Sequence, residues 1–333
     1  VGAASVRYDG ISGKGSAFRA VFEAAVRLGA RAVVVLDADL RSVTPQWIVR
    51  LAGPIIEDRA DYVTPLYHRH KFDGTITNSI VYPLTSALYG GNIRQPIGGD
   101  FGFSGALASL YLARDVWETD VARFGIDLWM TITALAERYR IAQAHLGAKV
   151  HDPKDPAASL AGMLVQVVGT AFTLMETYHD AWTTRSGALD APVLGEPLPA
   201  EITPVEVNLQ RMDEAFRRGV ENLETIYRQF LPPDVVDALC RAAFSPSLAG
   251  YDDPTWAHTI VHFADAHRRR ALPREQLLGT LTPLYLGRTA SFVRRNENSS
   301  IDEVERRIDE LRLAYHDHLP ELRALWGPAP LRP

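Results

Sequence analysis

Val33-Val34-Val35-Leu36-Asp37-Ala38-Asp39 is the stretch of the sequence that decides the fold. Four apolar residues in a row, three of them β-branched, are typical of a buried parallel strand. Two carboxylates follow, two positions apart, at the end of the strand where open α/β sheets bind their ligands. Because two acidic side chains repel each other, the pair favours a nearby cation, and a divalent metal that carries a diphosphate meets this requirement. Asp is also common in turns and helix caps, so the pair alone leaves a structural role open.

The composition limits the class of protein. The chain has 333 residues, 47% hydrophobic and 23% charged, which is ordinary for a soluble globular protein of one large or two medium domains. A net charge of −5 argues against a nucleic-acid binder, which needs a basic surface. The single cysteine, Cys240, cannot form an internal disulfide, and this suits a reducing cytoplasm. We expect a cytoplasmic protein without a signal peptide or a membrane span.

Two regions of the chain differ in their periodicity. Up to about residue 155, helical and strand-like patterns alternate, so we expect an α/β domain with a mostly parallel sheet over residues 1–155. After residue 156 the strand patterns stop, and the sequence predicts an all-helical region over residues 156–333. A linker is expected at about 186–204, where Pro and Gly are frequent. A broad helical region is also compatible with a homodimer.

The patterns predict individual elements as well. In the first region we expect helices at 16–28, capped by Ser16, from Thr44-Pro45 onward, and at 78–89 and 127–138. The expected strands are 31–39, 61–67, 97–104 and 141–150. In the second region the expected helices are 157–183, 202–230, 233–243, 254–269, 274–296 and 301–326.

A Gly-Lys-Gly turn, Gly13-Lys14-Gly15, precedes the first predicted helix. Backbone N–H groups at a helix N-terminus, together with the helix dipole and an ammonium group, can surround a phosphate. The turn is not a Walker loop, because no Ser or Thr follows Lys14 directly. A flexible Gly-rich loop is the structural alternative.

Three further segments carry residues suited to chemistry. Gly98 and Gly99 permit close approach of a ligand or a tight bend, and Asp100 after them could accept hydrogen bonds from sugar hydroxyls. A β-bulge is the alternative there. Asp127 complements the dipole of its predicted helix and could instead face a sugar or an acceptor hydroxyl. His151 follows the last strand, and a histidine ligand beside a carboxylate would favour Mn²⁺ over Mg²⁺.

Taken in order, the motifs GKG, DAD, QPxGG, GID and LGxxxH resemble those of one enzyme family. These are the retaining GT-A glycosyltransferases that make glycosylglycerates, the mannosylglycerate synthases and the glucosyl-3-phosphoglycerate synthases. The resemblance runs from about Gly13 past His151 and continues more weakly into the helical region. It implies a GT-A fold, a DxD motif, a nucleoside-diphosphate sugar as donor and a divalent metal, Mn²⁺ or Mg²⁺.

The resemblance also implies which residues bind the donor. Lys14 matches the lysine that contacts the nucleotide, and Asp37 matches the carboxylate that holds the nucleoside. Gly98, Gly99 and Asp100 fall where the loop of the family lies against the sugar.

Metal and catalytic roles follow from the same resemblance. Asp39 and His151 match the two protein ligands of the metal. Asp127 matches the acid beside the donor sugar and the acceptor, so Asp39 and Asp127 are the expected catalytic residues.

Residues 69–77 align without gaps to the acceptor loop of mannosylglycerate synthase. Arg69 and Thr77 match its glycerate-binding arginine and threonine, with Gly74 and Thr75 in the same loop. Met163 matches a residue whose backbone closes that site. An arginine fork binds a small carboxylate with two hydrogen bonds, while a hydroxyl and backbone amides can satisfy its other oxygens. A solvated basic loop is the alternative.

The chain departs from the family pattern in places. Thr75 stands where glucosyl-3-phosphoglycerate synthases have an arginine for the acceptor phosphate, so a phosphorylated acceptor is less favoured. Asp152-Pro153-Lys154 replaces residues that follow the metal histidine in mannosylglycerate synthase, a tyrosine among them. No strand or acidic turn that would hold the nucleobase precedes Lys14, so we expect the N-terminal strand of the domain to be missing.

The sequence therefore predicts a metal-dependent, retaining glycosyltransferase. The donor would be GDP-mannose or an NDP-glucose, the acceptor glycerate, and the product an α-glycosylglycerate that serves as a compatible solute. One alternative takes 3-phosphoglycerate as the acceptor. Two further alternatives are a sugar nucleotidyltransferase, which also combines a Gly-Lys loop with metal carboxylates, and a non-catalytic protein that binds nucleotide sugars.

Overall fold

The computed structural model describes residues 2, 5, 7–150, 156–185, 187, 189–198, 202, 205, 207–245, 248 and 251–327. The chain forms two compact units, and each unit is assembled from three separate segments. The first, which we call the sheet unit, comprises Val1–His68, Gln95–Asp152 and Asp190–Ala200. The second, which we call the helical unit, comprises Arg69–Arg94, Pro153–Leu189 and Glu201–Pro333. The predicted acceptor loop, residues 69–77, thus belongs to the helical unit.

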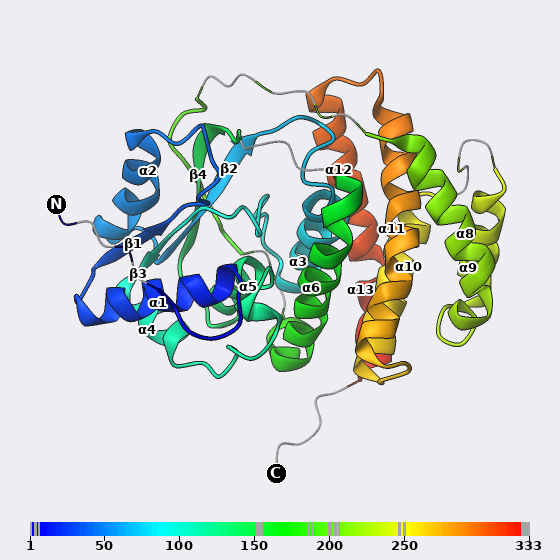
Figure 1. The fold of residues 1–333 in the computed structure, drawn as a ribbon, viewed down its shortest axis with the longest axis horizontal. Helices are drawn as coiled ribbons and strands as arrows, with labels where there is room; N and C mark the ends of the chain where they lie inside the picture. The colour runs from blue at the N-terminus through cyan, green and yellow to red at the C-terminus, as the bar shows by residue number, and fades with distance from the viewer. Residues whose placement is uncertain are drawn as a thin grey trace, which may run out of the picture. The chain divides into compact units, whose positions relative to one another are not determined.

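The sheet unit contains a five-stranded sheet in the order β1-β3-β2-β4-β5. Figure 1 labels the first four of these strands. β3 is antiparallel to both of its neighbours, whereas β2, β4 and β5 pair in parallel, so all strands except β3 point the same way. This confirms the prediction of an α/β fold with a mostly parallel sheet. The strands are β1 (Ala32–Val35), β2 (Tyr62–His68), β3 (Phe101–Ser104), β4 (Ile141–Ala148) and β5 (Val193–Leu194).

β5 corrects the expectation that strands stop after residue 156. Val193 and Leu194 pair with β4, although the segment was expected to be linker. The Arg50 side chain supports this edge, because it donates hydrogen bonds to the carbonyl oxygens of His145 at 2.6 Å and Glu196 at 2.8 Å. Two residues are too few to show a strand pattern, so the pairing depends on a distant partner that the local sequence does not reveal.

The helices of the sheet unit begin close to the predicted positions. α1 starts at Lys14 with Gly13 before it, so Ser16 lies inside the helix and is not its cap. The predicted start at Thr44-Pro45 is confirmed. Residues 105–112 form a helix for which we had no expectation. The helical elements are α1 (Lys14–Arg27), α2 (Pro45–Ile56), α4 (Gly105–Leu112), the 3₁₀ turn η2 (Asp120–Ala122) and α5 (Ile126–Ala136).

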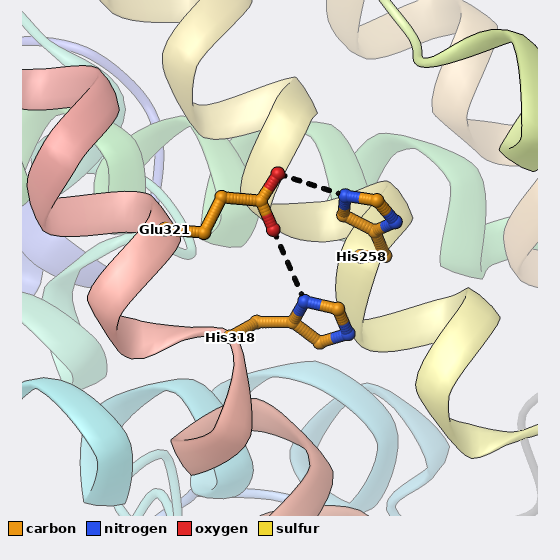
Figure 2. Close-up of side chains that lie close together, drawn as sticks. All are labelled: His258, His318 and Glu321. Atoms are coloured by element: carbon orange, nitrogen blue, oxygen red, sulfur yellow. Dashed lines mark hydrogen bonds and ion pairs between the residues drawn. The ribbon is translucent and has the colours of Figure 1, made fainter.

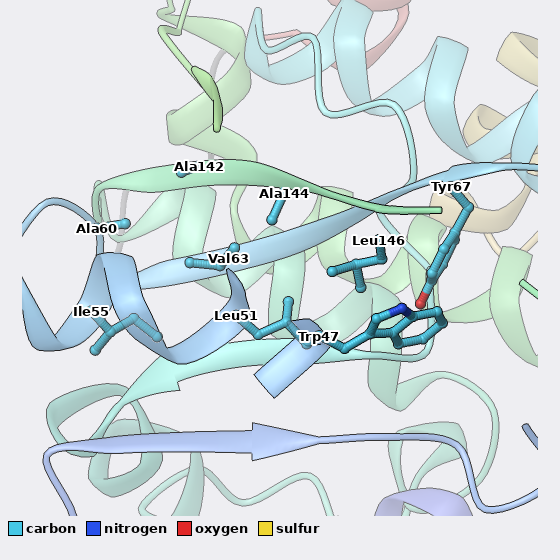
Figure 3. Close-up of a cluster of buried hydrophobic side chains, with 9 residues drawn as sticks. All are labelled: Trp47, Leu51, Ile55, Ala60, Val63, Tyr67, Ala142, Ala144 and Leu146. Atoms are coloured by element: carbon cyan, nitrogen blue, oxygen red, sulfur yellow. The ribbon is translucent and has the colours of Figure 1, made fainter. Parts of the chain in front are cut away.

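α2 packs against the sheet through one apolar face (Figure 3). Trp47, Leu51 and Ile55 recur every four residues, which places them on the same side of the helix, and all three are buried. Small side chains on β4, Ala142 and Ala144, face the same cluster. Small residues let a helix approach a sheet closely, so this packing fixes the sheet whose strand ends carry the site.

The helical unit is built from helices, and two of them, α9 and α11, have the bounds that the sequence predicts. Two long predicted helices are each divided in two, with breaks at Tyr178 and His318. Pro320 explains the second break, because proline lacks the N–H that a continuing helix needs. The elements are the π-helical turn η1 (Thr77–Val81), α3 (Tyr82–Tyr89), α6 (Pro156–Thr177), α7 (His179–Thr183), α8 (Leu209–Tyr227), α9 (Pro233–Ala243), α10 (Asp253–Arg268), α11 (Arg274–Asn296), α12 (Ile301–Asp317) and α13 (Leu319–Trp326).

No helix among the described residues is long and apolar enough to cross a bilayer.

An ion-pair network within the helical unit gives its stability a pH dependence. The Arg270 guanidinium binds both oxygens of Glu176 at 2.7 Å, and His267 Nδ1 lies 2.9 Å from the same carboxylate. Burial opposes ionisation of this carboxylate, but the two partners outweigh it and lower the pKa of Glu176 to about 2. A lowered folded-state pKa stabilises the fold above the ordinary value near 4.5, and the contribution disappears as the pH falls toward 2.

We therefore expect Glu176→Gln to destabilise the protein by about 2 kcal/mol at pH 7, because it weakens charge-assisted hydrogen bonds. The difference from the wild type should shrink as the pH falls from 4.5 toward 2. Urea unfolding of both proteins across this pH range measures it. A difference that stays constant with pH would show that the charge of Glu176 contributes nothing.

Candidate functional site

Charged side chains of the sheet unit meet at the edge of the sheet where β1 and β4 end. Because β3 runs antiparallel to β1, its beginning lies beside the end of β1. The segments before β3 and after β1 and β4 therefore come together with the starts of α1 and α5. We call this group the lysine–carboxylate cluster; it consists of Lys14, Asp37, Asp100, Asp127 and Lys149.

Lys14 bridges two carboxylates of the cluster. Its Nζ lies 2.8 Å from Asp37 Oδ1 and 2.8 Å from Asp127 Oδ1. It also donates to the carbonyl oxygen of Gly99 at 3.4 Å. One cation at the first residue of α1 thus joins the end of β1, the start of α5 and the glycine loop before β3.

The glycine after Lys14 serves close packing. A Cβ on Gly15 would fall 1.8 Å from the carbonyl oxygen of Val121, far inside contact distance. The Gly15 N–H donates to the carbonyl oxygen of Arg123 at 3.2 Å, so this amide is already paired. The alternative of a flexible Gly-rich loop is therefore wrong. Gly15 lets the start of α1 lie against η2, and this contact holds Lys14 in place.

Lys149 is the second cation, and the sequence analysis gave it no role. Its Nζ lies 2.8 Å from Asp37 Oδ2 and 3.1 Å from Asp100 Oδ2, and it donates to the carbonyl oxygen of Gly98 at 2.7 Å. The side chain is only 8% exposed, and these partners compensate for the loss of hydration of its ammonium group. Its position at the end of the predicted strand 141–150, as one of four lysines in the chain, was the available signal.

Asp100 connects the cluster to the hydrophobic core. It is fully buried, and its Oδ1 accepts the backbone N–H of Asp37 at 2.7 Å. Its Oδ2 accepts the hydroxyl of Tyr67, a residue that the sequence analysis also missed. The Tyr67 ring packs on Trp47 with ring centroids 5.5 Å apart (Figure 3). Protein groups therefore engage both oxygens of Asp100, which positions Asp37 and Lys149.

The charges of the cluster shift its pKa values strongly. Burial alone would raise the pKa of Asp37, but Lys14 and Lys149 outweigh it and hold that pKa well below its usual range. Burial alone would lower the pKa of Lys14, yet Asp127 and Asp37 raise it above its ordinary value. Burial raises the pKa of Asp127 against the pull of Lys14. Asp37 is therefore ionised at neutral pH, whereas Asp127 binds a proton more readily than an ordinary aspartate does.

Gly98 and Gly99 form a tight bend under the cluster. Gly99 has a φ of 90°, and a Cβ there would lie 2.1 Å from Asp37 Oδ2 and 2.9 Å from Lys149 Nζ. A Cβ on Gly98 would lie 2.2 Å from Pro65 Cγ. Both positions thus require glycine, and the groups that approach them closely belong to the protein itself.

We expect Gly99→Ala to cost about 2 kcal/mol of stability, through backbone strain and displacement of the Asp37 carboxylate. Gly279→Ala is the control, because Gly279 is an exposed residue inside α11, no proline follows it directly, and a Cβ there meets no atom within 4 Å. That variant should be as stable as the wild type or slightly more stable. Urea denaturation of the three proteins measures both effects; equal midpoints for Gly99→Ala and the wild type would contradict the expectation.

Of the two predicted metal ligands, Asp39 lies in the turn after β1. Asp39 is exposed, whereas the neighbouring Asp37 belongs to the lysine–carboxylate cluster. His151 lies outside the described residues. The Arg41 N–H donates to the carbonyl oxygen of Val150 at 2.9 Å, and the Val150 N–H donates to Ser42 Oγ at 3.1 Å. The turn that carries Asp39 is thus joined to the residue that precedes His151.

The predicted acceptor loop is ordered within the helical unit. Arg69 Nη1 lies 3.7 Å from Asp73 Oδ2, and the Asp73 side chain accepts the N–H of Gly74 at 2.7 Å. A Cβ added to Gly74 would lie 3.2 Å from Arg69 Nη1 and 3.9 Å from Thr77 Oγ1. The arginine, the glycine and the threonine that the resemblance selects therefore lie together.

Contacts with the helices anchor this loop. Lys71 Nζ donates to the carbonyl oxygens of Asn296 at 2.9 Å, Glu297 at 2.7 Å and Ser299 at 2.9 Å, at the end of α11. This is not the solvated basic loop that the sequence left open. Thr75 is also engaged, since its hydroxyl forms a hydrogen bond with that of a tyrosine on α11. Half-buried Met163 lies on α6, which packs against η1.

We compared the chain with known proteins. No family model matches it, and no curated protein matches it significantly. The chain is similar to a structure of glucosyl-3-phosphoglycerate synthase from Mycobacterium tuberculosis in complex with Mn²⁺, UDP-glucose and phosphoglyceric acid, with a TM-score of 0.40 and 24% identity over 50% of this chain and 56% of that one. A structure of that enzyme with Mg²⁺ and UDP gives the same values.

A third structure, of a mycobacterial protein, has a TM-score of 0.38 and 24% identity over 51% of this chain and 53% of that one. The chain thus matches a little over half the length of these proteins. The enzyme in the first two structures is one of the two that the sequence resemblance named.

Proposed function

We propose that the chain is a metal-dependent glycosyltransferase that moves a hexose from a nucleoside-diphosphate sugar to glycerate. The observation that carries the proposal is the lysine–carboxylate cluster at the edge of the sheet. Ligands of open α/β sheets bind at this edge, and the cluster gathers there two ammonium groups and three carboxylates. The ammonium groups can donate hydrogen bonds to a diphosphate, and the carboxylates can accept them from sugar hydroxyls.

The donor-site residues would divide these tasks. Lys14 would face the diphosphate, where its charge at the start of α1 adds to the positive end of the helix dipole. Asp37 would accept hydrogen bonds from the nucleoside, because its low pKa keeps it ionised. Lys149 and Asp100 are nearly buried and would position Asp37. Asp127 would face the donor sugar and the acceptor hydroxyl.

A divalent metal would be held by Asp39 and His151. The hydrogen bonds between Val150 and the turn at Arg41 and Ser42 support this pairing, because they bring the two ligand-bearing segments together. A carboxylate with an imidazole fits Mn²⁺. When bound, the metal would act as a Lewis acid that neutralises the leaving diphosphate.

The acceptor loop favours a small monocarboxylate. Lys71 is engaged by three carbonyl oxygens, and Thr75 stands where an arginine for a phosphate would be expected. Arg69 is the cation that the sequence resemblance assigns to the acceptor, and Thr77 lies beside it. One guanidinium matches the single charge of glycerate. 3-Phosphoglycerate is the second candidate, because the motifs also resemble those of the glucosyl-3-phosphoglycerate synthases.

We infer retention of the anomeric configuration by attack from the face that the diphosphate leaves. Asp127 is poorly suited to act as a covalent nucleophile, because burial raises its pKa and Lys14 engages its carboxylate. The product would then be an α-glycosylglycerate of the compatible-solute type.

A donor and acceptor panel tests the proposal. The protein is incubated with Mn²⁺ or Mg²⁺, with GDP-mannose, GDP-glucose, UDP-glucose or ADP-glucose, and with D-glycerate or 3-phosphoglycerate, and products are detected by mass spectrometry. We expect a hexosylglycerate from one of the donors. A product with 3-phosphoglycerate alone would favour the second candidate. With pyrophosphate added, formation of a nucleoside triphosphate and a sugar 1-phosphate from a donor would indicate a nucleotidyltransferase, and nucleotide binding without any turnover would indicate a non-catalytic protein.

A further inference from the structure

A group of histidines lies in the helical unit, outside the residues assigned above. His258 and His262 are four residues apart on one face of α10. His318 directly precedes α13, and Glu321 is the third residue of that helix (Figure 2). We call these four residues the histidine cluster. Their side chains are between 12% and 39% exposed, so an ion from solvent can reach them.

Three of the side-chain atoms form a nearly regular triangle. His258 Nε2 lies 3.1 Å from His262 Nε2 and 2.9 Å from Glu321 Oε1, and His262 Nε2 lies 3.0 Å from the same oxygen. His318 Nδ1 lies 3.2 Å from the other oxygen of Glu321. The ligand atoms of His258, His318 and Glu321 all lie within 4.8 Å of one another.

The three edges of this triangle cannot all be hydrogen bonds. The carboxylate oxygen only accepts, and each Nε2 either donates or accepts. If both nitrogens carry a proton, two donors face each other across the N···N edge. If one nitrogen is bare, its lone pair faces the carboxylate oxygen, and if both are bare, their lone pairs also face each other. A cation between the three atoms would satisfy all three lone pairs at once.

We propose that the histidine cluster is a binding site for a transition-metal ion of the Zn²⁺ class. His258, His262 and Glu321 supply three ligands, and His318, whose Nδ1 lies 3.2 Å from the other oxygen of Glu321, would hold that carboxylate in place. The spacing of the triangle agrees with this chemistry, because ligands at about 2.0–2.1 Å from a four-coordinate Zn²⁺ lie roughly 3.3 Å from one another. Imidazole-rich sites favour Zn²⁺, Co²⁺ or Ni²⁺ over Mg²⁺ and Ca²⁺, which prefer oxygen ligands.

Such an ion would tie α10 to the start of α13. Since both helices belong to the helical unit, the expected consequence is a more stable helical unit when the ion is bound. The site is separate from the metal site proposed for Asp39 and His151, and it does not depend on the glycosyltransferase activity.

Cobalt provides the test, because Co²⁺ held by nitrogen ligands in a four-coordinate site absorbs visible light. Metal-free full-length protein with the substitution Asp39→Ala, which removes the other proposed site, is titrated with Co²⁺ and then with Zn²⁺. We expect one equivalent of Co²⁺ to produce a visible band, Zn²⁺ to displace it, and Zn²⁺ to raise the Tm.

Variants of the cluster make the test specific. His262→Gln and Glu321→Gln, each in the Asp39→Ala background, should lower the affinity for Zn²⁺ by about 100-fold or more and abolish the Co²⁺ band. His316→Gln is the matched control, because His316 is a half-buried histidine of α12 outside the cluster. Circular dichroism of the metal-free proteins confirms that each variant folds. Absence of the band in the parent protein, or a band that survives in either folded cluster variant, would overturn the proposal.

Discussion

Replacing Lys14 with methionine should lower kcat/KM for glycosyl transfer about 1000-fold. Lys14 Nζ lies 2.8 Å from a carboxylate oxygen of Asp37 and 2.8 Å from one of Asp127. Methionine keeps most of the volume but removes the charge that would neutralise the donor diphosphate. The two carboxylates would also lose the cation between them. Their pKa values should therefore rise, and they should bind the donor less tightly.

Steady-state kinetics with varied donor measures this effect. Arg27→Met is the matched control, since Arg27 is an exposed cation in the last turn of the same helix. It should have wild-type kinetics. Lys14→Arg should recover part of the loss, because it restores the charge with a different shape. A Lys14→Met variant that folds and keeps wild-type kcat/KM would remove the lysine from the donor site.

Replacing Arg69 with alanine should raise the KM for glycerate about 100-fold and leave the KM for the donor nearly unchanged. Arg69 Nη1 lies 3.7 Å from Asp73 Oδ2. The carboxylate of an acceptor could take the place of this carboxylate beside the guanidinium. Thr77→Val should raise the same KM by a smaller factor, because it removes one hydrogen bond rather than a charge.

Initial rates with varied glycerate at saturating donor separate these effects. Arg306→Ala serves as the control, because Arg306 is an exposed arginine of the helical unit on α12. Its KM for glycerate should match that of the wild type. An unchanged KM in Arg69→Ala would show that the acceptor carboxylate is bound elsewhere.

The sequence predicts much of the fold because the patterns are local. The apolar run before Asp37 identifies β1, and the bounds of α9 and α11 follow from their periodicity and from Pro233 and Pro273 at or just before their first residues. The antiparallel direction of β3 and the edge strand β5 follow from pairing with distant strands. Residues 69–94 follow β2 directly but lie in the helical unit, and this placement also depends on contacts with distant parts of the chain.

The candidate site could be predicted in part for the same reason. Lys14, Asp37, Asp100 and Asp127 each lie beside the end of a regular element, where motifs are recognisable. Lys149 was missed because it looks like an ordinary residue at the end of a strand. Its role depends on three partners that lie at least 49 positions away.

The histidine cluster was missed for a related reason. Its members are spread from His258 to His318 and Glu321. His258 and His262 on α10 have the i, i+4 spacing of helical metal ligands, but two histidines alone do not make a site. Only the packing of α10 against α13 brings the ligands together.

The formation of hexosylglycerate with and without metal tests the proposed function most directly. The wild-type protein is incubated with D-glycerate and the nucleotide-sugar panel, in Mn²⁺ or in excess chelator, and the product and the released nucleoside diphosphate are quantified by mass spectrometry. We predict equal amounts of the two products in Mn²⁺ and none in chelator. Nucleotide release without any glycoside of glycerate or 3-phosphoglycerate, or transfer that persists in chelator, would contradict a metal-dependent glycosyltransferase of this type.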